Sequence, residues 1–147
     1  PMSGLEEIAV AVEAAVPSAT EWGNALPILH EIRHGLERLS DRGEPTLIDL
    51  RAIPFGPGDE ERLLGLLGRG EVEASISALG TTRIWESGIP AVWLIDHYNG
   101  ERERIALHIE INRVPDILCT QTEDIADAVA VLDDRLGINE AGTAKRA

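Results

Sequence analysis

Short segments in which apolar and polar residues alternate dominate the middle of the chain. Residues 71–78 and 104–111 show this alternation most clearly. Because successive side chains of a strand point to opposite faces, each segment has one apolar and one polar face. Such a pattern is typical of an antiparallel sheet that helices cover on one side. We therefore expect the covered side to hold Val72, Ala74, Ile76 and Ala78 from the first segment and Ile105, Leu107, Ile109 and Ile111 from the second, with Arg104, His108 and Glu110 outward.

Two further strands are predicted between these segments, at 82–87 and 91–98, joined by the turn Gly88-Ile89-Pro90. Asn99-Gly100 follows them, and this dipeptide is typical of a tight hairpin turn. The apolar run that begins after Pro45 and ends at Leu50 predicts one more strand. The sequence thus predicts an α+β fold, with an antiparallel β-sheet of about four or five strands and helices packed on one face.

Apolar residues at helical spacing predict helices at 5–15, 26–39, 59–67 and 125–136. Gly43 and Gly137 follow the second and the last of these and are expected to end them. We expect the helices at 26–39 and 125–136 to pack on the sheet. The chain is expected to be one domain over residues 1–147, with N-terminal helices at 1–44, a strand-helix-meander region at 45–118, a C-terminal helix at 119–138 and a frayed tail at 139–147.

The alternation fails in the central pair of strands, where two tryptophans lie at opposite phases. Trp85 directly follows Ile84, and Trp93 lies between Val92 and Leu94, so both faces carry large apolar groups. At most one tryptophan can then face the helices. The other is either covered by a loop or by the N-terminal helix, or exposed as an aromatic anchor for a protein partner. Our hypothesis is that the hairpin at 82–93 is a recognition surface with Trp85 as its anchor, and its candidate partner-binding residues are Arg83, Trp85, Glu86, Pro90 and Trp93.

The net charge narrows the class of partner, and the single cysteine indicates the cellular compartment. The 26 acidic residues outnumber the 13 basic ones, and a net charge of −13 disfavours nucleic acid and anionic lipid as partners. No apolar run is long enough to span a bilayer, so we expect no membrane insertion. The single cysteine, Cys119, has no second cysteine to pair with, which favours a reducing, cytoplasmic location.

Catalytic motifs are scarce in the sequence, and we expect no catalytic residue, cofactor or metal. The best cluster on neighbouring strands is Asp96, His97, His108 and Glu110. Strand phase separates Asp96 from His97 and puts the other two on the outer face, where polar residues are expected in any case. The alternative function is that of a small enzyme or metal-delivery protein that uses His97, His108, Glu110 or Cys119.

Three segments in this order, GRGEVEASIS, TTRIWESGIPAVWLI and IEINRVPDIL, resemble the conserved C-terminal region of hydrogenase expression/formation proteins of the HupH/HyaF type. The resemblance covers about residues 45–118. It implies a chaperone-like accessory role in the maturation of a NiFe uptake hydrogenase, with hydrogenase subunits or other accessory proteins as partners, and it implies no enzyme activity. Members of the family are typically longer, often with related sequence in both halves. A two-fold pairing of single copies would imitate that arrangement, so we also expect a homodimer.

Overall fold

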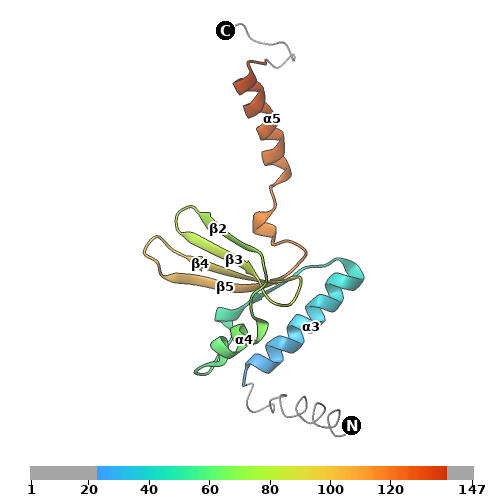
Figure 1. The fold of residues 1–147 in the computed structure, drawn as a ribbon, viewed down its shortest axis with the longest axis vertical. Coiled ribbons are helices and arrows are strands. Elements are labelled where there is room, and N and C mark those ends of the chain that lie inside the picture. The colour runs from blue at the N-terminus through green and yellow to red at the C-terminus, as the bar shows by residue number, and fades with distance from the viewer. Residues whose placement is uncertain (1–22, 139–147) are drawn as a thin grey trace, which may run out of the picture. The chain divides into compact units, whose positions relative to one another are not determined.

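The structure is a computed structural model that describes residues 23–138 (Figure 1). The predicted helix at 5–15 and the tail at 139–147 lie outside the described residues. The chain divides into two compact units, residues 1–113 and residues 114–147. The strands all belong to the first unit, and the last helix belongs to the second.

The first unit is built on a five-stranded antiparallel sheet, with the strand order β1-β5-β4-β3-β2. Strands β2 to β5 form a meander in which each pairs with the next along the chain, and β1 adds to the far side of β5. The predicted α+β class and the number of strands are confirmed. The strands are β1 (Thr46–Asp49), β2 (Glu73–Ser77), β3 (Thr81–Glu86), β4 (Val92–Tyr98) and β5 (Arg104–Ile111).

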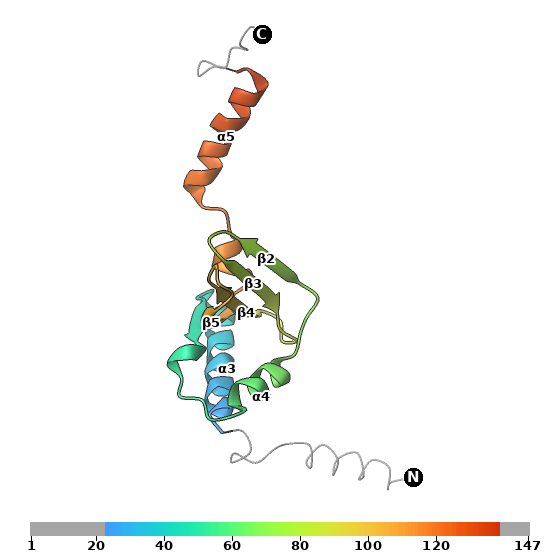
Figure 2. The same ribbon diagram turned by 90° about the vertical axis from the view of Figure 1, so that its left-hand side faces the viewer.

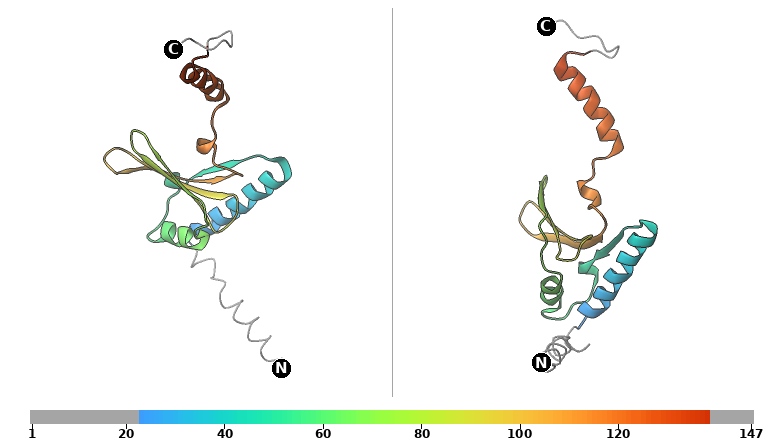
Figure 3. Two further views of the ribbon diagram at one scale, coloured as in Figure 1. Left: turned by 45° about the horizontal axis from the view of Figure 1, so that its top comes forward. Right: turned by 45° about the vertical axis from the view of Figure 1, so that its right-hand side comes forward.

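Two helices, α3 (Ala25–Arg42) and α4 (Asp59–Leu67), pack on one face of this sheet, as Figure 3 shows. Gly43 ends α3 in the left-handed conformation, with a φ of 70°, and its N–H donates to the carbonyl of Leu39. Glycine adopts this conformation without the steric penalty of a Cβ, so the predicted end of the helix is confirmed. A short 3-10 helix, η1 (Leu50–Ala52), follows β1.

The main hydrophobic core lies between these helices and the sheet. The α3 side chains of Ile28 and Ile32 are buried there because they repeat at helical spacing on one side of the helix. The helical, sheet and connecting segments contribute the buried residues Ala25, Ile28, Ile32, Ile48, Leu50, Leu63, Leu67, Trp85, Val92, Leu94, Leu107, Ile109 and Ile111.

The opposite face of the sheet carries a second hydrophobic cluster, to which β2 contributes, contrary to expectation. It consists of the buried residues Ile84, Trp93 and Ile95, with Ala74 and Ile76 of β2 packed against them. The expectation that the apolar side of β2 faces the helices is therefore wrong. The register determines the face that the apolar side chains of β2 join, because Ala74 pairs with Ile84 and directly paired residues point to the same face.

Strand β5 contains a second departure from the expected pattern. Its register with β4 shifts at His97 and Tyr98, where a β-bulge adds a residue to one strand. The side chain of Arg104 consequently turns to the buried Asp96, whereas Ile105 is 59% exposed. The bulge reverses the expected orientation of Arg104 and leaves Ile105 exposed rather than buried, and the expected orientations of Leu107, Ile109 and Ile111 are confirmed.

The turn between β4 and β5 is longer than the tight hairpin expected from Asn99-Gly100. The N–H of Asn99 donates to the carbonyl of Glu103. The Asn99 side-chain oxygen accepts from the N–H groups of Glu101 and Glu103, each at 2.9 Å. The asparagine thus organises a wider loop through its side chain, with Arg102 at a positive φ of 63°.

The second unit contains the 3-10 helix η2 (Asp116–Leu118) and the helix α5 (Thr122–Leu136), which ends at Gly137 as predicted. No residue of α5 is buried. Its apolar stripe, formed by Ile125, Val129, Leu132 and Leu136, is between 55% and 62% exposed. The packing of this helix on the sheet stays a prediction, as does the description of the chain as a single domain.

Candidate partner-binding surface

The β3–β4 hairpin, which contains all five candidate residues, is fixed at its turn by contacts with α4 and the segment that follows it. The Gly88 N–H donates to the Leu67 carbonyl at 2.7 Å. Gly70 lies so close to the turn that a Cβ there would be 2.7 Å from the Ser87 carbonyl oxygen. The hydroxyl of Ser87 donates to the carbonyl of Ile89 and accepts from its N–H. The turn is therefore held in one shape by backbone contacts on both sides.

Trp85 belongs to the main core and is only 9% exposed. The guanidinium of Arg69 lies over its ring, 4.6 Å from the ring centroid. Trp85 was expected to be the outward tryptophan, and that orientation is wrong. Its contribution to the binding of a partner stays a prediction.

Trp93 lies on the other face of the sheet, as the opposite phases of the two tryptophans predict. It belongs to the second cluster and is 6% exposed. Its indole N–H donates to the Asn112 carbonyl at 3.0 Å. The hydrogen bond satisfies the one polar group of the ring and holds it against the sheet.

The three other candidate residues have different environments. Arg83 is exposed on the helix-covered side and donates to Glu73 at 3.1 Å. Glu86 is half-buried on the opposite face, where it pairs across the strands with Trp93. Pro90 is exposed in the turn. The structure thus divides the five predicted residues between two faces and a turn, and it does not gather them into one patch.

The residues of the alternative site are only partly brought together. The rings of His97 and His108 meet edge to face, with their centroids 5.7 Å apart. The hydroxyl of Thr82 is 2.9 Å from Nδ1 of His97. Burial lowers the pKa of His97 below its ordinary value of 6.5, the nearby His108 lowers it further, and the carboxylate of Asp96 opposes both effects.

Glu110 makes a hydrogen bond of its own, and Cys119 belongs to the second unit. The carboxylate of Glu110 accepts from the side chain of Asn112 at 3.0 Å. Cys119 is exposed in the second unit, and its thiol is 3.7 Å from the Pro115 carbonyl. Among residues 23–138 there is no group of three or more histidine, cysteine or acidic side chains arranged to hold a metal ion.

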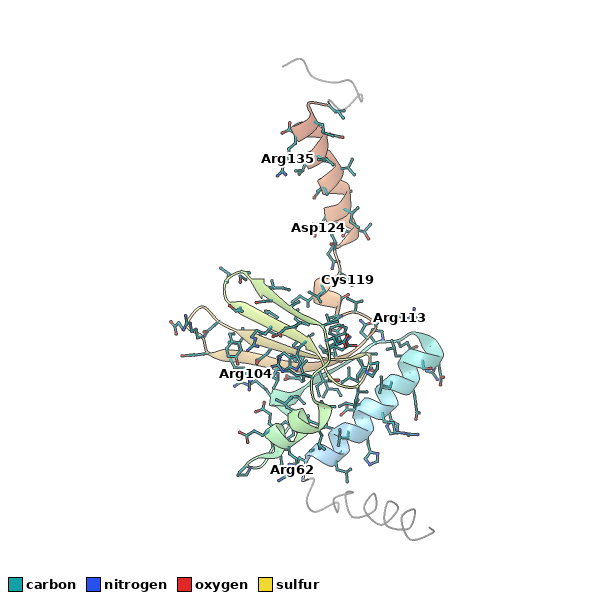
Figure 4. All side chains as sticks on the ribbon, viewed as in Figure 1. Arg62, Arg104, Arg113, Cys119, Asp124 and Arg135 are labelled. Carbon is teal, nitrogen blue, oxygen red and sulfur yellow. The ribbon has the colours of Figure 1, made fainter. Side chains whose placement is uncertain are left out.

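The structure contains a partly buried ion pair between Asp96 and Arg104 that the sequence did not predict. The two nitrogens Nε and Nη2 of Arg104 donate to the two oxygens of Asp96 at 2.8 Å and 3.0 Å. Glu60 of α4 accepts from Nη1 at 3.2 Å, so Arg104, labelled in Figure 4, connects the sheet to the helix. The hydrogen bond to Asp96 raises the pKa of Arg104 above its ordinary value and keeps the guanidinium charged. No feature of the sequence signals this pair, because it depends on the bulge.

Comparisons with known proteins place the chain in a family. Residues 23–138 match the family described as HupH hydrogenase expression protein, C-terminal conserved region. The chain is 30% identical over 107 residues to the hydrogenase expression/formation protein HoxQ of Azotobacter vinelandii, covering 71% of this chain and 38% of the relative. It is also 30% identical over 111 residues to the hydrogenase expression/formation protein HupH of Rhizobium leguminosarum bv. viciae, covering 76% and 39%.

A solved structure supports the same assignment. The hydrogenase expression protein HupH from Thiobacillus denitrificans superposes with a TM-score of 0.74 at 41% identity, covering 77% of this chain and 94% of that one. The chain spans less than two fifths of the length of the curated relatives that it matches. Within residues 23–138, no helix has the length and apolar character needed to cross a membrane. The family match and the structural similarity agree with each other, and the chain belongs to the family of HupH hydrogenase expression proteins.

Proposed function

We propose that this protein is a non-catalytic, chaperone-like accessory protein that assists the maturation of a NiFe uptake hydrogenase. The observation that carries the proposal is the match of residues 23–138 to a family named for hydrogenase expression. Its proposed partners are a hydrogenase subunit or another accessory protein of hydrogenase assembly. We place this role in the cytoplasm, in keeping with the single unpaired cysteine.

The proposed binding surface is the β3–β4 hairpin. Its turn exposes Ile89 and Pro90, and Arg83 is exposed on the strand that leads to it. An exposed apolar turn suits a protein partner, and Arg83 adds a charged side chain on the strand that leads to the turn. Because Trp85 and Trp93 are buried, we propose that they fix the shape of the hairpin, and that a partner contacts the exposed residues of the turn.

A pull-down from cells that express the hydrogenase genes tests this role. We expect a tagged form of the chain to recover a hydrogenase subunit or accessory protein. The double variant Arg83→Ala/Pro90→Ala should reduce the recovery about tenfold, since truncation of contact residues commonly costs 1–2 kcal/mol of binding free energy or more, as an order-of-magnitude figure. Arg33→Ala, at an exposed position of α3 that pairs with Glu37, is the matched control and should leave the recovery unchanged. The proposal fails if the unaltered chain recovers no protein of the hydrogenase system.

A small enzyme or metal-delivery protein is the second candidate function, and the adjoining rings of His97 and His108 are the observation that favours it. Metal analysis of the purified chain distinguishes the two. A stoichiometric metal that disappears in His97→Ala would support the second function. A metal-free protein with unchanged pull-down behaviour would contradict it.

A further inference from the structure

Strand β2 is an edge strand with few of the features that usually prevent pairing with another chain. Its one strand neighbour among the described residues is β3, and it forms the edge of the sheet in two perpendicular views (Figures 1 and 2). Residues 71–80 contain no proline and no lysine, two residues that commonly protect exposed edges. The opposite edge strand, β1, is bounded by Pro45 and by η1, so it offers a shorter and interrupted edge.

The register shows which backbone groups of β2 point away from the sheet. The Glu86 N–H donates to the Val72 carbonyl, and the Ala78 N–H donates to the Gly80 carbonyl. Hydrogen-bonded and non-hydrogen-bonded pairs alternate along an antiparallel ladder, so Ala74 and Ile76 also bond to β3. The N–H and C=O groups of the residues between them point outward. These residues are Glu73, Ser75 and Ser77.

We propose that β2 pairs antiparallel with β2 of a second copy of this chain, about a two-fold axis at Ser75, so that the two sheets become one. This register places Ser75 opposite Ser75 of the second copy and Glu73 opposite its Ser77. All of these are residues whose backbone groups point outward, so each pair exchanges two hydrogen bonds. The register uses the whole of β2 (Glu73–Ser77) in both copies.

The same register also places complementary side chains of the two copies opposite one another. On the face of the second cluster it places Ala74 opposite Ile76 of the second copy, and its continuation places Val72 opposite Ala78. The cluster formed by Ile84, Trp93 and Ile95 would thereby continue across the two-fold axis. This pairing gives a reason for the apolar side of β2, which faces away from the helices and is not fully buried within one copy.

Charge does not oppose the pairing at the edge itself. Glu73 is the only charged residue of β2, and the two-fold axis places it opposite a serine rather than opposite another glutamate. Its carboxylate already contacts the guanidinium groups of Arg83 at 3.1 Å and Arg69 at 3.5 Å. The one carboxylate of the edge strand is therefore already paired with basic side chains, although the whole chain carries a net charge of −13.

Engineered disulfides in the full chain test both the dimer and its register. In a Cys119→Ser background, Ser75→Cys should form a covalent dimer in a glutathione redox buffer, because directly opposed Cα atoms about 5.5 Å apart lie within disulfide range. Ser77→Cys is the matched control. The two copies of residue 77 would be about 14 Å apart, so this variant should stay monomeric on a non-reducing gel. Equal cross-linking of both variants, or none in Ser75→Cys, would overturn the proposal.

Light scattering of the full chain supplies an independent measurement. The unaltered chain and Ser75→Thr should both show a dimer mass that falls on dilution. Ser75→Pro removes the N–H donor at the two-fold axis, and we expect it to raise the dimer dissociation constant at least about tenfold. A monomer mass for the unaltered chain at every concentration would overturn the proposal. The disulfide experiment keeps the proposal testable if Ser75→Pro does not fold, and neither experiment depends on the hydrogenase role.

Discussion

Trp85 is the residue whose role the structure changes most. Its ring is buried between the sheet and the helices, and Arg69 covers it from the solvent side. We predict that Trp85→Ala lowers the free energy of unfolding by about 3–5 kcal/mol, as truncation of a buried aromatic residue commonly does. Chemical denaturation followed by circular dichroism measures this loss.

Arg69→Ala is the control for Trp85, because it removes the guanidinium above the ring, with its exposed ion pair to Glu73, and leaves the ring itself in place. An exposed cation–π contact contributes about 0.5–1 kcal/mol, so this variant should lose much less stability. If Trp85→Ala lost no more free energy of unfolding than Arg69→Ala, the ring would not be part of the core. The hypothesis that Trp85 is an exposed anchor would then be supported again.

His97 makes stability depend on pH below neutrality. Burial is the main reason that its pKa lies below the ordinary value of 6.5 in the folded protein. As the pH falls through 6.5, the unfolded chain takes up a proton that the folded chain resists, so the unfolded state is favoured. We predict that His97 destabilises the fold on acidification from pH 7.5 to 5.5, and that His97→Gln loses less stability over this interval than the unaltered chain.

The measurement is a series of urea denaturation curves at different pH values. His30→Gln, at an exposed position of α3, is the matched control and should follow the unaltered chain. Parallel curves for His97→Gln and the unaltered chain would show that the folded protein does not resist protonation of His97.

At the scale of elements, two helical glycines should respond oppositely to the same change. Gly35 lies where α3 approaches the sheet, and a Cβ there would be 2.6 Å from Cδ1 of Ile111 and 3.3 Å from Oγ1 of Thr46. A Cβ at Gly65 of α4 would have no neighbouring atom within 4 Å. Alanine gains about 1 kcal/mol over glycine in a helix, whereas overpacking of a core costs about 1–3 kcal/mol.

We therefore predict that Gly65→Ala stabilises the protein by about 0.5–1 kcal/mol and that Gly35→Ala destabilises it by about 1 kcal/mol. Urea denaturation of both variants provides the comparison. A stabilising Gly35→Ala would show that Ile111 can move aside and that α3 is not held at a fixed distance from β5.

The elements themselves were largely predictable, because their signals are local. The stripe of α3 and its end at Gly43 follow from helical spacing and from the conformational freedom of glycine. The face on which each strand buries its apolar residues was less predictable. Alternation shows that Ala74 and Ile76 share a face, but the pairing of Ala74 with Ile84 decides which face it is.

In the candidate site too, features that depend on one strand were predictable, and features that depend on packing between distant segments were not. The opposite phases of the two tryptophans were visible in the sequence, because phase is a property of one strand. Which of them lies beneath the helices depends on where α3 and α4 pack, and no single segment carries that information. The ion pair of Arg104 was hidden for a similar reason, since the bulge that turns its side chain arises from the pairing of β4 with β5.

At the scale of the whole molecule, the two units make a prediction about folding. The two hydrophobic clusters are formed by residues between Ala25 and Ile111, and the first unit ends at Arg113. The described part of α5 contributes no buried residue. We predict that a chain that ends at Arg113 folds cooperatively and loses only about 1 kcal/mol of stability, since Pro115 is the one buried residue among the described residues that it removes.

Urea unfolding followed by tryptophan fluorescence tests the truncated chain, in which the indole of Trp93 keeps its acceptor at Asn112. A chain that ends at Leu107 is the control, and it should not fold because it lacks Ile109 and Ile111, two fully buried residues of the main core. If the chain that ends at Arg113 lost much more than 1 kcal/mol, residues 114–147 would have to cover part of the sheet. The apolar stripe of α5 would then have the packing role that its periodicity predicts.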